Sequence, residues 1–298
     1  MPEKVKVNPE FTAHPPRVNE FRRFIKVFLG RPVVIIGAVI LVVFFVCALV
    51  PQFLAPYDPL KLDYYSILSP PGHGHLLGTD ALGRDMFSRI IYGARTALII
   101  ATCAIGFASV MGTVLGLSAG YFGGWTYTII MRIIDTLMAF PGMLLMLTIA
   151  ALLGGGIKMV IIALGIGAIS GYTRVMCGQT MSIRENDYIL AERSLGSSSK
   201  RIMFKHLFPN AFPPMIVMMT LAVGMTIMAE AGLSYLGIGV KDPTIAWGSL
   251  VNDGNQYLLS RPWLSLAPGI AIMLVVFAFN MVGDGLRDAL DPRLRGTL

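Results

Sequence analysis

Long apolar stretches, separated by short charged or glycine-rich segments, constrain this chain more than any other feature. Residues 33–50 are apolar without interruption, and residues 96–131 contain no charged side chain. At about 1.5 Å per helical residue, the first stretch covers roughly 27 Å, close to the thickness of a bilayer hydrocarbon core. A chain with several such stretches is expected to be a polytopic membrane protein built from helices.

The composition supports this class. Only 14% of the 298 residues are charged, where a soluble domain has about 25%, and the mean hydropathy is +0.68. Collagen-like, disordered and disulfide-rich secreted proteins are excluded. The three cysteines, Cys47, Cys103 and Cys177, are too few and too scattered for a metal site or a disulfide framework, and we expect them to pack between helices.

Six membrane-spanning helices are predicted, with the breaks placed at glycine-rich turns. Residues 120–124 separate the second from the third, and residues 154–156 separate the third from the fourth. The third is expected to continue through Pro141. The glycines at 112, 116 and 120 and at 165, 167 and 171 are expected to allow close helix approach. The predicted spans are 33–50, 94–121, 125–153, 157–177, 212–237 and 264–283.

The distribution of basic residues predicts the orientation. With both termini inside, 17 of the 24 Lys and Arg residues lie on the inner side, as the positive-inside rule requires. The net charge of +7 therefore reflects topology and does not indicate nucleic-acid binding. The chain divides into a cytoplasmic N-terminal segment (1–32), a first transmembrane helix that is not cleaved (33–50), an extracytoplasmic loop (51–93), a five-helix core (94–288) with a long inner loop (178–211), and a cytoplasmic tail (289–298).

The inner loop 178–211 has the pattern of two helices joined by a glycine. Asn186 or Asp187 is expected to cap the first helix, and Gly196 to end it in a left-handed conformation. One of the serines at 197–199 is expected to cap the second helix, which is expected to stop at Pro209. Such a unit can lie on the bilayer or fit a groove on a partner protein. Its apolar side chains are Tyr188, Ile189, Leu195, Ile202, Met203, Phe204, Leu207 and Phe208, and its basic ones are Arg193, Lys200, Arg201 and Lys205.

The same loop resembles the EAA loop of ABC-importer permeases. The resemblance lies in Ala191-Glu192, then Gly196, then the segment from His206 to Pro209, and it departs from the family pattern at Leu190, His206 and Phe208. Further segments resemble the second permease of dipeptide and oligopeptide importers. They are Leu77-Gly78-Thr79-Asp80, Gly83-Arg84-Asp85, Ser88-Arg89, Gly93-Ala94-Arg95, Asp135, Phe140-Pro141, residues 230–237, Trp247-Gly248 and residues 290–293.

The resemblance implies an all-α membrane protein with six transmembrane helices, in the type I ABC-importer permease fold with cytoplasmic coupling helices. It implies a non-catalytic subunit of a bacterial or archaeal inner membrane that imports di- or oligopeptides. Its partners would be a homologous permease, two cytoplasmic ATPase subunits that carry ATP and Mg, an extracytoplasmic substrate-binding protein and the lipid bilayer. The chain itself would bind no cofactor, metal or nucleic acid. The residues expected to couple to the ATPase are Ala191, Glu192, Gly196, Ser197, Lys200, Arg201, His206 and Pro209.

Three charged residues in the predicted spans are candidates for a gate or an interface. Arg132 and Asp135 are three residues apart, so they share a helix face, and an intrahelical ion pair is the simpler interpretation. Glu230 is the one acid in the middle of the fifth apolar stretch. It is either an ion site or, as we favour, the partner of a basic residue such as Lys158 or Arg95.

The outer loops hold candidate contacts for the binding protein. Asp80, Arg84, Asp85 and Arg89 are expected to form a network of ion pairs and caps before the second span. The contact residues proposed from the sequence are Asp80, Arg84, Asp85 and Trp247. His73 and His75 have no third metal ligand nearby and are interpreted as loop residues.

An intramembrane enzyme and an ion-coupled carrier are the other function classes for a chain of this composition. All four histidines lie outside the spans, which argues against an intramembrane enzyme, and the chain has no G-x-x-x-x-G-K-[ST] phosphate loop. An ion-coupled secondary carrier is the alternative, with Glu230 as its ion site. Within the resembling subfamily, nickel, glutathione and oligosaccharides are alternative substrates.

Overall fold

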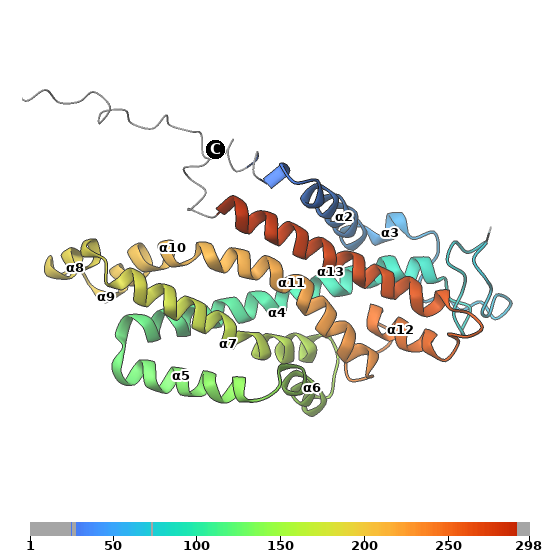
Figure 1. Ribbon diagram of the computed structural model, residues 1–298. Helices are drawn as coiled ribbons and strands as arrows, with labels where there is room; N and C mark the ends of the chain where they lie inside the picture. Colours follow the sequence, from blue (N-terminus) through green and yellow to red (C-terminus); the bar gives the residue numbers. More distant parts are fainter. Residues whose placement is uncertain (1–24, 26–27, 73, 291–298) are drawn as a thin grey trace, which may run out of the picture.

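The computed structural model describes residues 25, 28–72 and 74–290, and the described part is almost entirely helical (Figure 1). Five helices are long and apolar enough to cross a membrane, and the number is six if the bent pair α5 and α6 is one broken span and not a re-entrant loop. The elements are α2 (Pro32–Leu49), α3 (Pro51–Leu54), α4 (Met86–Phe122), α5 (Gly124–Ala139), α6 (Gly142–Leu153), α7 (Ile157–Arg184), α8 (Asp187–Ser194), α9 (Ser199–Arg201), the π-helix η2 (Ile202–Leu207), α10 (Phe208–Ala211), α11 (Pro213–Tyr235), α12 (Trp247–Asn255) and α13 (Trp263–Leu290).

The long helices run side by side in one bundle whose two ends differ (Figure 1). One end carries the short helices α8 and α9, and we call it the α8 end. The opposite end carries α3, the loop that precedes α4, and α12, and we call it the α12 end. The predicted spans therefore occur in the expected order, and the predicted inner and outer loops lie at opposite ends.

The third predicted span is not one straight helix. It breaks between α5 and α6, whose axes differ by 92°. Phe140 precedes Pro141 and adopts an extended conformation with ψ of 140°, because the proline ring disfavours helical backbone at the residue before it. The third apolar stretch therefore forms two helices that meet at Pro141, and the expected span through Pro141 holds only where this bent pair is one span.

Several helices are longer than their apolar stretches. α4 begins at Met86 and not near residue 94, because Asp85 caps it by accepting a hydrogen bond of 2.7 Å from the Ser88 backbone N–H. α7 continues past residue 177 to Arg184, and α13 past residue 283 to Leu290. Hydropathy marks where a helix leaves the apolar layer, whereas hydrogen bonding and capping decide where it ends.

The α4–α7 interface is the largest between two helices, and glycines permit its close approach. A Cβ atom built on Gly112, Gly116 or Gly120 would lie within 2.4–2.7 Å of an atom of α7. The prediction of close approach along this stripe is confirmed. Gly165, Gly167 and Gly171 differ, because their nearest neighbours are side-chain atoms of Phe107, Met146 and Met218.

Candidate functional site

The loop at the α8 end has the predicted helix–glycine–helix form. α8 ends at Ser194, and Gly196 follows in the left-handed conformation with φ of +77°. The Ser197 backbone N–H then donates to the Glu192 carbonyl at 3.1 Å, which closes the turn. Ser198 caps α9 by accepting from the Arg201 N–H at 3.4 Å, whereas Asn186 makes no side-chain cap for α8.

The second helix of the loop does not stop at Pro209, contrary to the sequence prediction. α9 passes into the wider turn of η2 and then into α10, where Pro209 occupies the first turn. A proline is tolerated in a first turn because its missing N–H has no intrahelical acceptor there. Only Phe212, itself in helical conformation, separates α10 from α11, so the chain is nearly continuous from the loop into a membrane helix.

Glu192 joins the two halves of the loop. Its carboxylate accepts a hydrogen bond from the Ser197 hydroxyl, and its Oε1 lies 3.6 Å from Nε2 of His206 in η2. The hydrogen bond from Ser197 is the main reason that the pKa of Glu192 is lowered below its usual value. Glu192 therefore braces the turn around Gly196 instead of extending freely into solvent.

The inner face of the loop packs against the ends of α4 and α7. Ile189, Ile202 and Leu207 are at most 1% exposed and belong to a core cluster that includes Tyr121 of α4. The Arg193 guanidinium lies 5.2 Å from the centre of the Tyr121 ring, at a cation–π distance. The loop is thus braced on α4 by apolar and cationic contacts.

Arg184 adds a second link between the loop and α4. It is the last residue of α7, and its Nη1 donates to the carbonyls of Gly120 at 3.0 Å and Tyr121 at 3.2 Å. Those carbonyls lie in the last turn of α4, where a cation also interacts favourably with the helix dipole. No local sequence pattern indicates this role of Arg184.

The outer face of the loop exposes apolar side chains next to cations. Leu195 is 83% exposed and Phe204 64% exposed, while Tyr188 and Leu190 are close to half exposed. Ala191, Lys200 and Arg201 are exposed as well. We call Tyr188, Leu190, Leu195 and Phe204 the outer patch. Large exposed side chains clustered on two short helices are typical of a surface that binds another protein.

The candidate gate residues have other partners than predicted. Asp135 pairs with Arg174 of α7 at 2.5 Å, and not with Arg132, to which no described residue forms an ion pair. Both side chains of the pair are 46% exposed, and they line a cavity of about 580 Å³ together with Arg132. The spacing of residues within one helix does not predict Arg174 as the partner of Asp135, because the two residues are 39 positions apart in the sequence.

Glu230 makes no ion pair with Lys158, Arg95 or any other described residue, so that prediction is wrong. The residue is 1% exposed, and its Oε1 accepts a 2.7 Å hydrogen bond from the Ser234 hydroxyl. The Ser234 oxygen also accepts from the Val240 N–H at 3.1 Å. Glu230 therefore holds the turn that follows α11.

The network at the α12 end is confirmed, and it is buried. Asp80 accepts from the backbone N–H groups of Leu82 and Arg84 at 2.9 Å each, and its carboxylate also binds the side chains of Arg84 and Arg89. The carboxylate of Asp85, besides capping α4, lies 2.9 Å from Nδ1 of His75. The other predicted histidine, His73, lies outside the described residues.

Most of the residues proposed as contacts for the binding protein are buried, so a docked protein could not touch them directly. Asp80 and Asp85 are at most 6% exposed, the Arg84 side chain is 12% exposed, and Trp247 is 3% exposed. The Trp247 indole N–H donates to the Ile90 carbonyl of α4 at 2.8 Å. The prediction of surface contact is wrong for Asp80, Asp85 and Trp247, which instead fix the shape of the loops around them.

Comparison with known proteins identifies the family and the fold. The model of a family described as "Binding-protein-dependent transport system inner membrane component" matches residues 112–296, and that of the "N-terminal TM domain of oligopeptide transport permease C" matches residues 19–71. The chain is 38% identical over 294 residues to the dipeptide transport system permease protein DppC of Alkalihalophilus pseudofirmus, covering 97% of both chains. It is also 38% identical to the glutathione transport system permease protein GsiD of Pectobacterium atrosepticum, covering 92% of both.

A solved structure supports the fold alone. An inward-facing form of the MetNI methionine ABC transporter matches with a TM-score of 0.57 and 19% identity, covering 69% of this chain and 98% of that chain.

Proposed function

Because the chain belongs to the family of binding-protein-dependent transport system inner membrane components, we propose that it forms half of a pathway that imports short peptides. It is a permease subunit of an ABC importer and a multi-pass protein of the inner membrane. Relatives named for dipeptides and for glutathione, itself a tripeptide, favour short peptides over nickel or oligosaccharides.

The proposed assembly has four kinds of component. A homologous permease forms the other half of the pathway, two ATPases that carry ATP and Mg bind at the α8 end, and a binding protein delivers the substrate at the α12 end. Both termini and the α8 end are cytoplasmic, as the excess of basic residues on that side favours. This chain contributes no catalytic group to ATP hydrolysis.

The observation that carries the proposal is the division of loop 178–211 into two faces. The outer patch is exposed and suits a groove on an ATPase, while the inner face is buried against α4 and α7. A push on the outer patch would pass through Ile189 and the Arg193–Tyr121 contact to α4. Coupling residues at 191, 200 and 201 face the ATPase, whereas Glu192, Ser197 and His206 act as positioning residues for the turn at Gly196.

The interface with the second permease is proposed to include α5. Ile134 is the one residue of α5 that is buried, so nearly the whole helix is available to a partner. The exposed Asp135–Arg174 pair lies on this side and is suited to an interface or a gate. At the α12 end, Tyr64, Tyr65 and Leu76 are at least 64% exposed and replace the buried residues as candidate contacts for the binding protein.

Docking is tested by placing a charge on the outer patch. We expect Leu195→Asp to abolish copurification of the ATPase, because the carboxylate would be desolvated in the docking groove. Leu259→Asp is the matched control, since Leu259 is also an exposed leucine, even more exposed than Leu195, but lies in the loop at the α12 end. Neither change touches the core, so both variants should accumulate normally. Retention of the ATPase and of uptake by Leu195→Asp would refute docking at this patch.

The substrate is tested separately, by uptake of radiolabelled dipeptides, glutathione, nickel and an oligosaccharide into cells with and without the chain. Loss of dipeptide or glutathione uptake on deletion, restored by the wild-type chain and not by Leu195→Asp, is the expected result. Loss restricted to nickel or to the oligosaccharide would overturn the short-peptide assignment and leave the permease assignment intact.

A further inference from the structure

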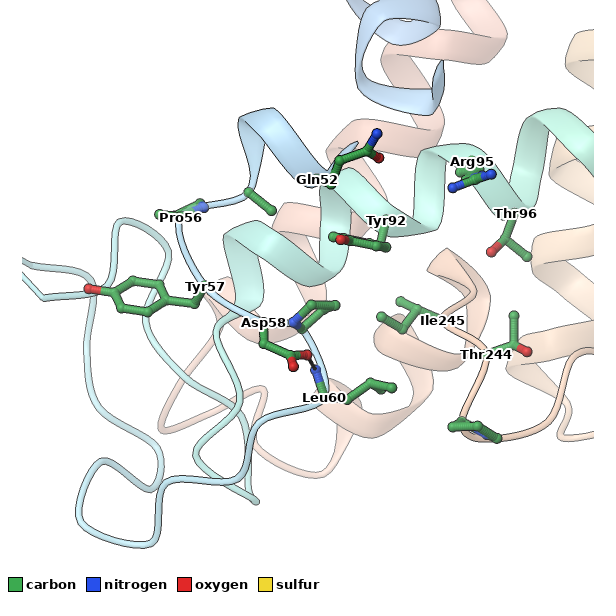
Figure 2. Close-up of a pocket in the computed structure, with 13 residues that line it drawn as sticks. Gln52, Pro56, Tyr57, Asp58, Leu60, Tyr92, Arg95, Thr96, Thr244 and Ile245 are labelled. Atoms are coloured by element: carbon green, nitrogen blue, oxygen red, sulfur yellow. Dashed lines mark hydrogen bonds between the residues drawn. The ribbon is translucent and has the colours of Figure 1, made fainter. Parts of the chain in front are cut away.

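A cavity lined by both polar and apolar side chains opens at the α12 end, beside the first turns of α4 (Figure 2). Its volume is about 560 Å³, within the range of about 300–1,000 Å³ typical of small-molecule sites. Gln52 lies in α3, Tyr92, Arg95 and Thr96 extend from α4, and Thr244 lies in the loop that precedes α12. The cavity is thus built from three segments that are distant in sequence.

Among the described residues, Arg95 is the one cation that lines this cavity, and none of them neutralises it. The residue is exposed, and no described residue forms an ion pair or a hydrogen bond with its guanidinium. Asp58 is the one lining carboxylate, and its Oδ1 accepts from the Leu60 N–H at 2.9 Å. The lining therefore carries one positive and one negative group and complements a ligand that carries both charges.

The cavity lies where a membrane surface would cross the bundle. The apolar helix α2 ends at Leu49, three residues before Gln52 of the lining. From Arg95, one face of α4 runs toward the α8 end through Ile99, Val110 and Val114, which are 42–62% exposed. A guanidinium at the head of an exposed apolar stripe matches the amphipathic character of a phospholipid.

We propose that this cavity binds the headgroup of a zwitterionic phospholipid of the phosphatidylethanolamine type, in the leaflet at the α12 end. The phosphate is held by Arg95, whose planar guanidinium matches two phosphate oxygens. The ammonium lies toward Asp58, and an acyl chain covers the stripe of Ile99, Val110 and Val114. The carboxylate of a short peptide would offer Arg95 the same chemistry, but it has no apolar chain to cover the stripe.

The test uses the purified transporter, with phosphatidylethanolamine, phosphatidylglycerol and a dipeptide as probes, and native mass spectrometry to count bound molecules. We expect phosphatidylethanolamine to bind the wild type, and Arg95→Gln to weaken that binding about tenfold through the lost charge-assisted hydrogen bonds. Lys158→Gln is the matched control, because Lys158 is an exposed cation near the start of α7, outside the cavity, and binding should be unchanged.

Three results would overturn the proposal. Phosphatidylethanolamine binding equal in Arg95→Gln and wild type would remove Arg95 from the site. Equal or tighter binding of phosphatidylglycerol would contradict the pairing with Asp58. Displacement of the lipid by the dipeptide, dependent on Arg95, would make the cavity a peptide site. If Arg95→Gln fails to accumulate, Arg95→Lys decides the matter, since a lysine keeps the charge and should bind the lipid measurably more weakly than the wild type.

Discussion

The close contact of α4 and α7 predicts a large effect of a single methyl group. In Gly116→Ala, the new Cβ would lie 2.5 Å from the Thr173 carbonyl oxygen and 2.8 Å from the Met176 Cβ. An ordinary contact needs at least 3.4 Å, so α7 would have to move away by about 0.9 Å at this point. Because the nearest atom belongs to the backbone, no rotamer change relieves the clash, and overpacking of this kind costs about 1–3 kcal/mol.

Gly106→Ala is the control that separates the overpacking cost from the other effects of a glycine-to-alanine change. Gly106 lies in the same helix, and a Cβ built on it has no neighbour within 4 Å. Both substitutions gain the same helix propensity, about 1 kcal/mol, so this contribution cancels in their difference. We expect Gly116→Ala to be less stable than Gly106→Ala by about 1–3 kcal/mol.

The assay is equilibrium unfolding of both variants and the wild type in mixed detergent micelles, followed by tryptophan fluorescence. Equal unfolding free energies for the two variants would refute the argument that backbone contact at Gly116 sets the spacing of α4 and α7. As an internal comparison, Gly167→Ala should be milder than Gly116→Ala, because its nearest neighbour is the flexible Met146 side chain.

Three further predictions concern the polar contacts. Trp247→Phe removes the hydrogen bond to α4 from a buried site and should lower the unfolding free energy by about 1–3 kcal/mol, measured in the same assay. In a His206→Gln variant, which removes the imidazole beside Glu192, coupling of ATP hydrolysis to uptake in proteoliposomes should not change between pH 8 and pH 5.5: the pKa of Glu192 is lowered by Ser197, so the hydrogen bond between them is complete above the usual glutamate pKa of about 4.5 and is lost only as the pH falls through the lowered value. Asp135→Asn breaks an exposed pair with Arg174 and should change the unfolding free energy by no more than about 1 kcal/mol, so a large loss of uptake in this variant would indicate a gate or interface role.

The helix–glycine–helix form of the candidate site could be predicted from the sequence, because it depends on residues that are close together in the chain. Gly196 adopts the predicted left-handed conformation, and the serines and the apolar spacing placed two short helices around it. The spacing did not indicate which apolar side chains would turn inward. Ile189 and Leu207 are buried, whereas Leu195 and Phe204 belong to the outer patch. That division depends on where α4 and α7 end, which no pattern within the loop records.

The sequence by itself determined the membrane class, the order of the spans, the helix–glycine–helix loop and the Asp80 network, because hydropathy, capping and glycine conformation act within a few residues. Only the tertiary structure decided the 92° bend between α5 and α6, the pairing of Asp135 with Arg174, and the burial of Trp247 against α4. Pro141 locates the bend and the fold sets its angle, whereas the other two features depend on how helices distant in sequence rotate and pack against one another. The apolar pattern of a membrane helix sets its length but not the neighbour that each face meets.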